Sequence, residues 1–136
     1  MTKVAVYGSL RQGMGNHSLL AGQQLVSCTM TKEPFVMYTL GGFPMISLYG
    51  KKVSPITVEV YDVDEACLER LNRLEGFYGK GDRNFYDRSE IETADGLTAL
   101  IYHIEDRTMS DDRIVESGDW VEYYSALHHG RKHVGW

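Results

Sequence analysis

Two short segments of this sequence place polar groups beside a glycine, an arrangement that can bind or transform a small molecule. In the first, Tyr7-Gly8-Ser9-Leu10, an apolar stretch ends at the glycine. Glycine permits a sharp turn and the close approach of a ligand, and successive backbone N–H groups in such a turn can converge on an anion such as a carboxylate. The other interpretation of this segment is an ordinary transition from a strand to a loop.

The second segment centres on Glu75, which is followed by Gly76, Phe77 and Tyr78. The pattern before it predicts a helix that ends at Gly76, so Glu75 lies near the negative end of the helix dipole. The dipole and burial beside the two aromatic residues would both raise the pKa of this carboxyl. A carboxylate with a raised pKa is a better general base near neutral pH. The other interpretation is an exposed surface glutamate.

Other polar clusters are weaker candidates. His128, His129 and His133 are close in sequence, but no cysteine pair and no HExxH pattern accompanies them, which disfavours a metal site. Asp111 and the residue after it are typical of a solvated loop. Ser9 lies outside any GxSxG pattern, which disfavours a serine nucleophile there. The glycine loop also lacks the signatures of P-loops and dinucleotide-binding folds. We therefore expect a site without metal or cofactor.

Strands and helices must position these segments. Apolar runs and alternation predict strands over residues 3–7, 25–31, 35–40, 56–63, 85–93 and 97–104. The stretch over 56–63 alternates, which predicts a strand with one buried face. The two glycines before Phe43 are expected to break the strand over 35–40.

Three helices are predicted. In the central one, Asp64 is a favourable N-cap, and an apolar stripe follows at helical spacing: Cys67, Leu68, Leu71 and Leu74. Asn16 is expected to cap a short helix over residues 17–22, and Asp119 a final helix that begins with Trp120. Residues 106–118 are predicted to be a loop, and residues 128–136 lack helical periodicity.

These elements predict one α+β domain over residues 1–136, with a compact curved β-barrel of six or seven strands and two or three flanking helices. The net charge of −5 argues against nucleic acid as a partner, and no stretch has the length and apolarity of a membrane span. Cys28 and Cys67 are too few for a disulfide framework, and we expect reduced thiols in a cytoplasmic protein. The oligomeric state is not predicted.

Short motifs follow one another along most of the chain: Val6-Tyr7-Gly8-Ser9-Leu10-Arg11, Gly15-Asn16, Tyr38 with Leu40, Gly42-Phe43-Pro44, Val58-Glu59-Val60-Tyr61, Leu71 with Leu74-Glu75-Gly76-Phe77, Tyr86 with Arg88, Ala99 with Tyr102, and Ser117-Gly118-Asp119-Trp120. In this order and spacing they resemble the γ-glutamylcyclotransferase superfamily, in its small bacterial and AIG2-like branch.

The resemblance implies an enzyme that cyclises a γ-glutamyl group to 5-oxoproline and releases an amine or amino acid. The family's general acid/base corresponds to Glu75, and its substrate-binding loop to Tyr7, Gly8, Ser9 and Leu10. The expected partner is therefore a small γ-glutamyl molecule, with no cofactor. Two alternatives stay open: a non-catalytic module that binds an amino-acid-like ligand, and an enzyme for γ-glutamylamine cross-links or another conjugate. We further expect the loop after Tyr7 to line the largest polar cavity and to face Glu75.

Overall fold

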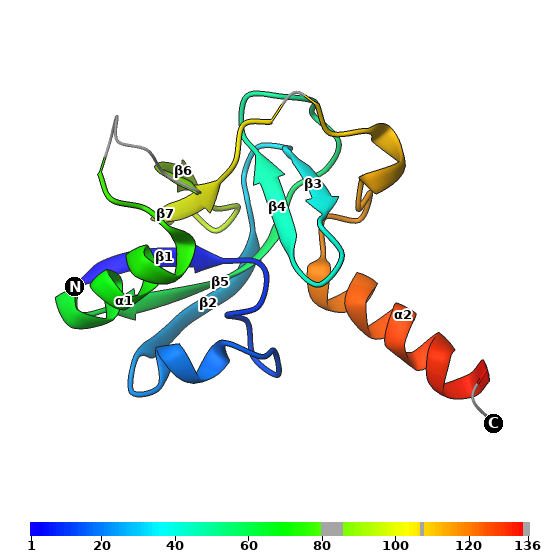
Figure 1. Cartoon of the computed structure of the whole chain (residues 1–136). Helices are drawn as coiled ribbons and strands as arrows, with labels where there is room; N and C mark the ends of the chain where they lie inside the picture. The colour runs from blue at the N-terminus through cyan, green and yellow to red at the C-terminus, as the bar shows by residue number, and fades with distance from the viewer. Residues whose placement is uncertain (80–85, 107, 135–136) are drawn as a thin grey trace.

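The structure is a computed structural model, and it describes residues 1–79, 86–106 and 108–134. Its strands are β1 (Thr2–Val6), β2 (Gln24–Met30), β3 (Val36–Thr39), β4 (Pro44–Ser47), β5 (Thr57–Val63), β6 (Asp87–Glu92) and β7 (Thr98–His103). Its helices are α1 (Glu65–Glu75) and α2 (Trp120–Val134), with short 3-10 helices at His17–Leu20 and Asp111–Arg113 (Figure 1).

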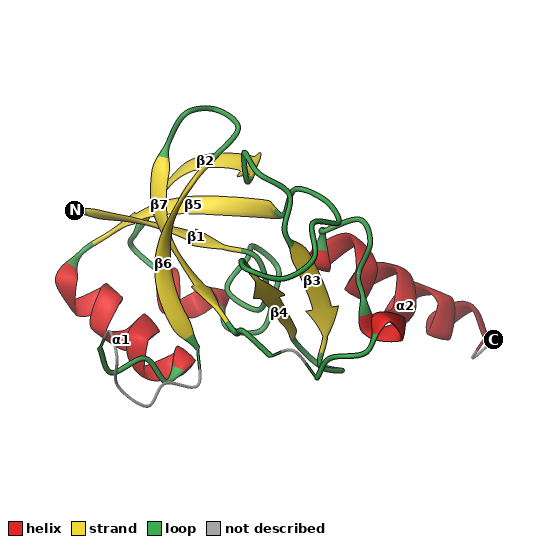
Figure 2. Cartoon of the chain, turned by 90° about the horizontal axis from the view of Figure 1, so that it is seen from above, coloured by secondary structure: helices red, strands yellow, loops and turns green. Residues whose placement is uncertain are grey.

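Five strands form one mixed sheet in the order β2-β5-β1-β7-β6, in which only the β1–β7 pair is parallel among the described residues. Strands β3 and β4 pair with each other as a separate hairpin (Figure 2). The edge strands β2 and β6 meet through a single bridge between the residues that follow them, Thr31 and Thr93. The α+β class is confirmed, but the predicted barrel is not supported: two of the seven strands leave the sheet, and its edges stay unpaired along most of their length.

The sheet separates two apolar cores. On one face, Val4, Val6 and Tyr61 pack in a cluster with Cys67 and Leu71 of α1. On the other face the cluster is formed by alternate residues of the sheet, the hairpin and the start of α2: Ala5, Val58, Val60, Ile101, Met37, Ile46 and Trp120. Removal of this apolar surface from water is the main stabilising contribution. The first core fixes α1, and therefore Glu75, against the sheet.

Strand β5 is buried on both faces, so the predicted half-exposed strand is wrong. Glu59 is 4% exposed and Tyr61 is 3% exposed, although both lie on the face of the strand opposite to Val58 and Val60. The reason is topological, because β5 pairs with β2 on one side and β1 on the other, and a layer covers each face.

Helix α1 begins and ends as the sequence predicts. The Asp64 carboxylate accepts a hydrogen bond of 2.7 Å from the N–H of Cys67, and Gly76 is left-handed with φ 66°. Leu74 departs from the prediction, because it is 42% exposed and lies away from the buried stripe.

The other two helices differ more from expectation. The side chain of Asn16 makes no capping bond to the helix over His17–Leu20. Asp119 does cap α2, since its carboxylate accepts from the N–H of Glu122 at 3.1 Å. Helix α2 continues to Val134 and projects away from the sheets (Figure 1), so residues 128–134 are helical despite their lack of periodicity. A helix that projects into solvent needs no apolar stripe.

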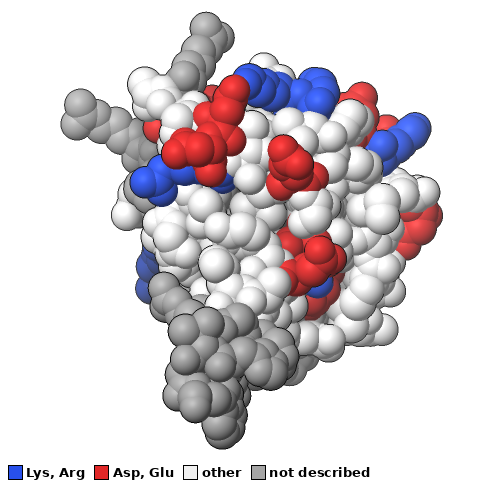
Figure 3. Space-filling model, turned by 90° about the vertical axis from the view of Figure 1, so that its right-hand side faces the viewer, with Lys and Arg blue, Asp and Glu red and all other residues white. Residues whose placement is uncertain are grey.

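On the face shown in Figure 3, Asp and Glu side chains are scattered among Lys and Arg, and the described residues form no continuous basic patch there. No helix in the described part of the chain is long and apolar enough to cross a membrane.

Candidate active site

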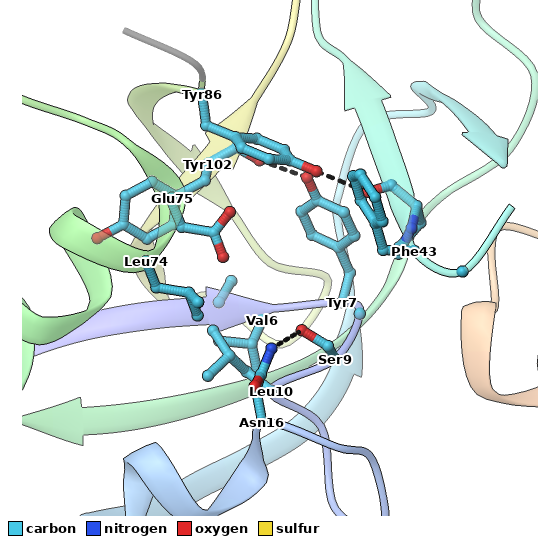
Figure 4. A pocket seen from close by; sticks show the side chains of 14 residues that line it. Val6, Tyr7, Ser9, Leu10, Asn16, Phe43, Leu74, Glu75, Tyr86 and Tyr102 are labelled. Carbon is cyan, nitrogen blue, oxygen red and sulfur yellow. Dashed lines mark hydrogen bonds between the residues drawn. The ribbon is translucent and has the colours of Figure 1, made fainter. Parts of the chain in front are cut away.

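A cavity of about 380 Å³ lies where the end of β1 meets the end of α1. Its walls come from six segments of the chain: residues 5–10, Asn16, the turn Gly42-Phe43-Pro44, Leu74 and Glu75 at the end of α1, Tyr86 just before β6, and Tyr102 in β7 (Figure 4). These segments are distant in sequence, and the two apolar cores bring them together.

The carboxylate of Glu75 points into this cavity (Figure 4). The backbone carbonyl of Glu75 accepts a hydrogen bond of 3.0 Å from the N–H of Tyr86, which fixes the end of α1 against the start of β6. No side chain or N–H group among the described residues donates to the carboxylate. Burial raises the pKa of Glu75 to about 7, so both protonation states are accessible near neutral pH.

The apolar surroundings of Glu75 differ from the prediction. Phe77 is buried beneath the guanidinium of Arg88, 4.5 Å from the ring centroid, and Tyr78 is 70% exposed, so neither lines the cavity. Val6 and Leu74 supply the aliphatic wall instead. The chain reverses direction at Gly76, which explains why the residues after it turn away from the carboxylate.

Three tyrosines surround Glu75, and each hydroxyl is held by a hydrogen bond. Tyr7 donates to the carbonyl of Tyr102 at 2.7 Å, Tyr86 to the carbonyl of Pro44 at 2.8 Å, and Tyr102 to the side-chain oxygen of Asn72 at 2.6 Å. Burial is the main cause that raises the pKa of all three hydroxyls. The negative charge of Glu75 is a smaller cause that also raises it. These tyrosines therefore stay protonated near neutral pH, and they position the walls rather than act as bases.

The loop after Tyr7 is held by bonds that leave two donors available. The N–H of Asn16 donates to the carbonyl of Ser9 at 2.8 Å, and its side-chain amide donates to the Ser9 hydroxyl at 2.9 Å. The N–H of Arg11 donates to the carbonyl of Gly8 at 3.0 Å. The N–H groups of Ser9 and Leu10 meet no acceptor in the described parts of the chain, so they remain free to bind a ligand.

Gly8 is required by the close approach of the β3–β4 turn. A Cβ atom at this position would lie 2.8 Å from Cγ of the Pro44 ring, which is shorter than real Cβ contacts. Any side chain would therefore push the turn away from the loop, and the two segments that form this wall of the cavity would separate.

Arg11 anchors the loop to the rest of the molecule. Its Nε bonds to Oε2 of the buried Glu59 at 3.0 Å, and its Nη1 bonds to Oδ1 of Asp119 at 2.8 Å. The other carboxylate oxygen of Glu59 accepts from the N–H of Gln12 at 3.0 Å and from the hydroxyl of Tyr61 at 2.8 Å. The loop is thus tied to strand β5 and to the first turn of α2.

The structure places all five predicted site residues, Tyr7, Gly8, Ser9, Leu10 and Glu75, around one cavity, and their chemical roles stay predictions. This cavity was expected to be the largest polar cavity. That expectation is wrong, because a larger hollow of about 570 Å³ lies beside β6. That hollow forms where β6 meets the loops after β2 and β4, a tertiary feature that no local pattern shows.

Among the lining residues that were not predicted to belong to the site are Asn16, Phe43, Tyr86 and Tyr102. Asn16 was expected only to cap a helix, and the other three were noticed only as parts of motifs. Their positions at loop and strand ends gave no sign of which face meets the cavity, since that depends on the register between strands.

No group of three or more His, Cys, Asp or Glu side chains in the described ranges is placed to hold a metal ion. The side chains of His128, His129 and His133 lie outside the described residues, so the prediction for that cluster stays a prediction.

Comparisons with known proteins agree on one family. Residues 4–122 match the family model described as gamma-glutamyl cyclotransferase, AIG2-like. A Vibrio cholerae protein provisionally named a gamma-glutamylcyclotransferase is 38% identical over 119 residues, which cover 88% of this chain and 95% of that protein. The gamma-L-glutamyl-butirosin B gamma-glutamyl cyclotransferase of Niallia circulans is 34% identical over 129 residues, covering 90% of this chain and 78% of the relative.

Solved structures are similar in fold. The crystal structure of an uncharacterized Pyrococcus horikoshii protein has a TM-score of 0.73 at 28% identity, and the match covers 95% of this chain and 98% of the other. An AIG2-like protein from Mus musculus has a TM-score of 0.71 at 20% identity, with 88% of each chain covered. The second match supports the fold alone.

The stability of the protein should report the burial of Glu75. An ordinary glutamate has a pKa of 4.5, but in the folded protein the carboxyl of Glu75 keeps its proton up to about pH 7. Because the folded state binds the proton more tightly than the unfolded chain, the free energy of unfolding falls as pH rises from 4.5 to about 7. We expect Glu75→Gln to remove this fall and to gain up to about 3 kcal/mol over wild type above pH 7.

Urea unfolding across this pH range measures the effect. Glu69→Gln is the matched control, since Glu69 lies on α1 with its side chain exposed. An equal pH dependence in wild type and Glu75→Gln would show that the carboxylate is solvated in the folded protein.

The anchor at Arg11 gives a second stability prediction. Arg11→Met leaves the Glu59 carboxylate buried without its cation, which we expect to lower the free energy of unfolding by about 3–5 kcal/mol. Lys3→Met, which breaks the half-exposed pair with Asp62, should lower it by only about 0–1 kcal/mol. In the double variant Arg11→Met with Glu59→Gln, part of the loss should return, and strictly additive losses in denaturant unfolding would contradict a coupled pair.

Proposed function

Because the chain belongs to the gamma-glutamyl cyclotransferase, AIG2-like family and is a γ-glutamylcyclotransferase enzyme, we propose that it converts a γ-glutamyl group to 5-oxoproline with Glu75 as general acid and base. The observation that carries this proposal is the partly buried Glu75 carboxylate, with a pKa raised to about 7, in a cavity that is also lined by Ser9 and Leu10, whose N–H groups meet no acceptor in the described part of the chain.

In the proposed reaction, both reacting groups belong to the substrate. The Glu75 carboxylate removes a proton from the substrate α-ammonium, and the freed amine nitrogen attacks the γ-carbonyl carbon. The protonated Glu75 then returns the proton to the leaving nitrogen as the bond from that nitrogen to the γ-carbon breaks. A five-membered lactam and a free amine or amino acid result. A carboxyl with a pKa near 7 suits both transfers, since it gains and loses a proton with similar ease.

The binding of a folded-back conformer supplies much of the expected rate gain. Holding an amine against its own γ-carbonyl can contribute roughly 7–11 kcal/mol through proximity and orientation. The N–H groups of Ser9 and Leu10 have two possible tasks: they bind the α-carboxylate, or they stabilise the negative charge that develops on the γ-carbonyl oxygen. The rigid tyrosine walls at Tyr7 and Tyr86 limit the space and keep the conformer compact.

The substrate is a γ-glutamyl molecule in this proposal, and its leaving group stays open. The name of the Niallia circulans relative specifies γ-L-glutamyl-butirosin B, which supports a γ-glutamyl conjugate as the substrate class. A purely binding role is not favoured, because a ligand site gains nothing from a carboxylate that burial keeps close to half protonated near neutral pH.

Replacement of Glu75 tests the catalytic role. Glu75→Gln keeps the size of the side chain but removes the base, so we expect kcat to fall by ~10²–10⁴. The assay is release of 5-oxoproline from a panel of γ-glutamyl amino acids and γ-glutamyl amines. Substrate affinity should change less, because the loop donors remain. The control Glu69→Gln changes a carboxylate on the same helix and should leave kcat unaffected. Turnover by Glu75→Gln at a rate near wild type would remove Glu75 from the mechanism.

The pH profile gives an independent prediction. The free enzyme acts through the ionised carboxylate, so kcat/KM should rise with pH and level off above about pH 7. Substrates with different leaving groups should show the same acidic limb, because it belongs to the enzyme. A limb near pH 4.5, the ordinary glutamate value, would mean that Glu75 is not desolvated in the working enzyme.

A further inference from the structure

A second group of reactive side chains lies on the face of the sheet opposite to α1. The hydroxyl of Ser89 lies 2.8 Å from Nε2 of His103, and Nδ1 of His103 lies 2.7 Å from Oε2 of Glu105. In the register of β6 and β7, Ser89 is opposite Ile101, two residues before His103. Side chains two residues apart share a face, so the pairing itself brings the serine and the histidine together. The function proposed above uses none of these residues.

Glu105 is held as an ionised acceptor. Its two oxygens accept from the hydroxyl of Ser47 at 2.6 Å and from the N–H groups of Leu48 and Tyr49 at 2.9 and 3.1 Å, besides His103. Burial acts to raise the pKa of Glu105, but these donors outweigh it and lower the pKa below its ordinary value. A carboxylate can only accept, so Nδ1 of His103 must carry the proton of the hydrogen bond between them.

This protonation determines what Nε2 can do. In the neutral imidazole, a proton on Nδ1 leaves a lone pair on Nε2, so Nε2 accepts and the Ser89 hydroxyl donates. His103 is 2% exposed, and the ring of Tyr49 packs edge-on against it with centroids 5.8 Å apart. The imidazole is therefore fixed in orientation and shielded from water. A serine, a base with an available lone pair and a carboxylate that orients the base form the arrangement of a nucleophile–base–acid triad.

Ser89 opens into a hollow that can hold a ligand. The hollow of about 570 Å³ is lined by Ser89 together with apolar, cationic and anionic residues, among them Phe35, Lys52 and Glu33. The ammonium of Lys52 lies over the Phe35 ring, 4.9 Å from its centroid. A small apolar group fits the Phe35 and Leu48 side of this hollow, with the serine hydroxyl at its edge.

The edge of β6 that faces away from β7 supplies a donor beside Ser89. The N–H of Thr93 bonds to Leu97 on the β7 side, whereas the carbonyl of Glu92 accepts from the N–H of Lys32 on the other side. The backbone N–H and C=O groups of successive residues alternate in direction along an antiparallel strand. The N–H of Glu90 therefore points to the same side as the carbonyl of Glu92, away from β7. Glu90 also lines the hollow, and its N–H follows the serine directly in sequence. A donor in this position can stabilise an oxyanion on a carbonyl attacked by Ser89.

We propose that Ser89, His103 and Glu105 form a second site, which transfers a short acyl group from an activated ester through the Ser89 hydroxyl. The Ser89 oxygen bonds to the acyl carbon while its proton passes to Nε2 of His103. The bond between the acyl carbon and the leaving oxygen breaks, and His103 returns the proton to that oxygen. A water molecule then gives a proton to Nε2 of His103 as its oxygen bonds to the acyl carbon. The bond between that carbon and the Ser89 oxygen breaks, and His103 returns the proton to the serine, which releases the acid. Glu105 is a positioning residue that holds the reactive tautomer of His103.

The test uses the full chain with p-nitrophenyl acetate and, separately, a fluorophosphonate probe. We expect an initial release of about one p-nitrophenolate per protein, and a probe adduct on Ser89 in the peptide mass map. Ser89→Ala should lower the ester rate at least about tenfold and abolish the adduct. Ser125→Ala, at an exposed serine of α2, should match wild type. Glu75→Gln, which we expect to lose 5-oxoproline formation, should still cleave the ester at the wild-type rate. The reason is that Glu75 and Ser89 belong to separate cavities.

A separate measurement tests whether Glu105 sets the tautomer of His103. The 15N chemical shifts of the His103 ring report which nitrogen carries the proton, and we expect Nδ1 in wild type. In Glu105→Gln the amide can donate to Nδ1, so the proton should move to Nε2 and acylation should slow. No adduct on wild-type Ser89, an adduct on another residue only, or an ester rate unchanged in folded Ser89→Ala would overturn the proposal. The mass map of the wild-type protein decides the question even if a variant fails to fold.

Discussion

The buried ion pair between Arg11 and Glu59 is the interaction on which the geometry of the candidate active site depends. Taking a carboxylate and a guanidinium out of water is costly, and a pair of this kind is retained only when its geometry and hydrogen bonds are good. Here the cost is offset by four bonds, to Glu59 from Arg11, Gln12 and Tyr61 and from Arg11 to Asp119. The result is a loop whose path is fixed by the protein itself, with two N–H groups, of Ser9 and Leu10, that meet no acceptor among the described residues.

Glu75 reflects a different compromise. A carboxylate in the last turn of a helix, partly withdrawn from water, destabilises the folded state at neutral pH. Nothing in the packing of α1 needs it, because Cys67 and Leu71 already bury the helix against the sheet. Unfavourable local choices that persist in a well-packed framework are most often found at functional sites. The energetic cost of Glu75 is thus itself an argument for its role, independent of family membership.

The sequence was informative where local rules decide the structure. The helix that ends at Gly76 and the placement of Glu75 follow from capping and periodicity, and both were predicted. Strand β4 was missed, because Pro44–Ser47 is short and follows two glycines. The burial of Glu59 and the open sheet were also missed, since both depend on which strands become neighbours, and single-strand patterns do not specify that. The same limit explains why Tyr86 and Tyr102 were noticed as motifs but not placed in the cavity.

Strand β7 explains how one small sheet can support two separate sets of polar groups. Tyr102 and His103 are adjacent in sequence, and successive side chains of a strand point to opposite faces. Tyr102 therefore reaches the cavity of Glu75, while His103 bonds to Ser89 and Glu105 on the other face. The two sets share the backbone of β7, and the charges of Glu75 and Glu105 both raise the pKa of the Tyr7 hydroxyl. The alternation of a single strand thus directs two sets of polar side chains to opposite faces of the sheet within a chain of 136 residues.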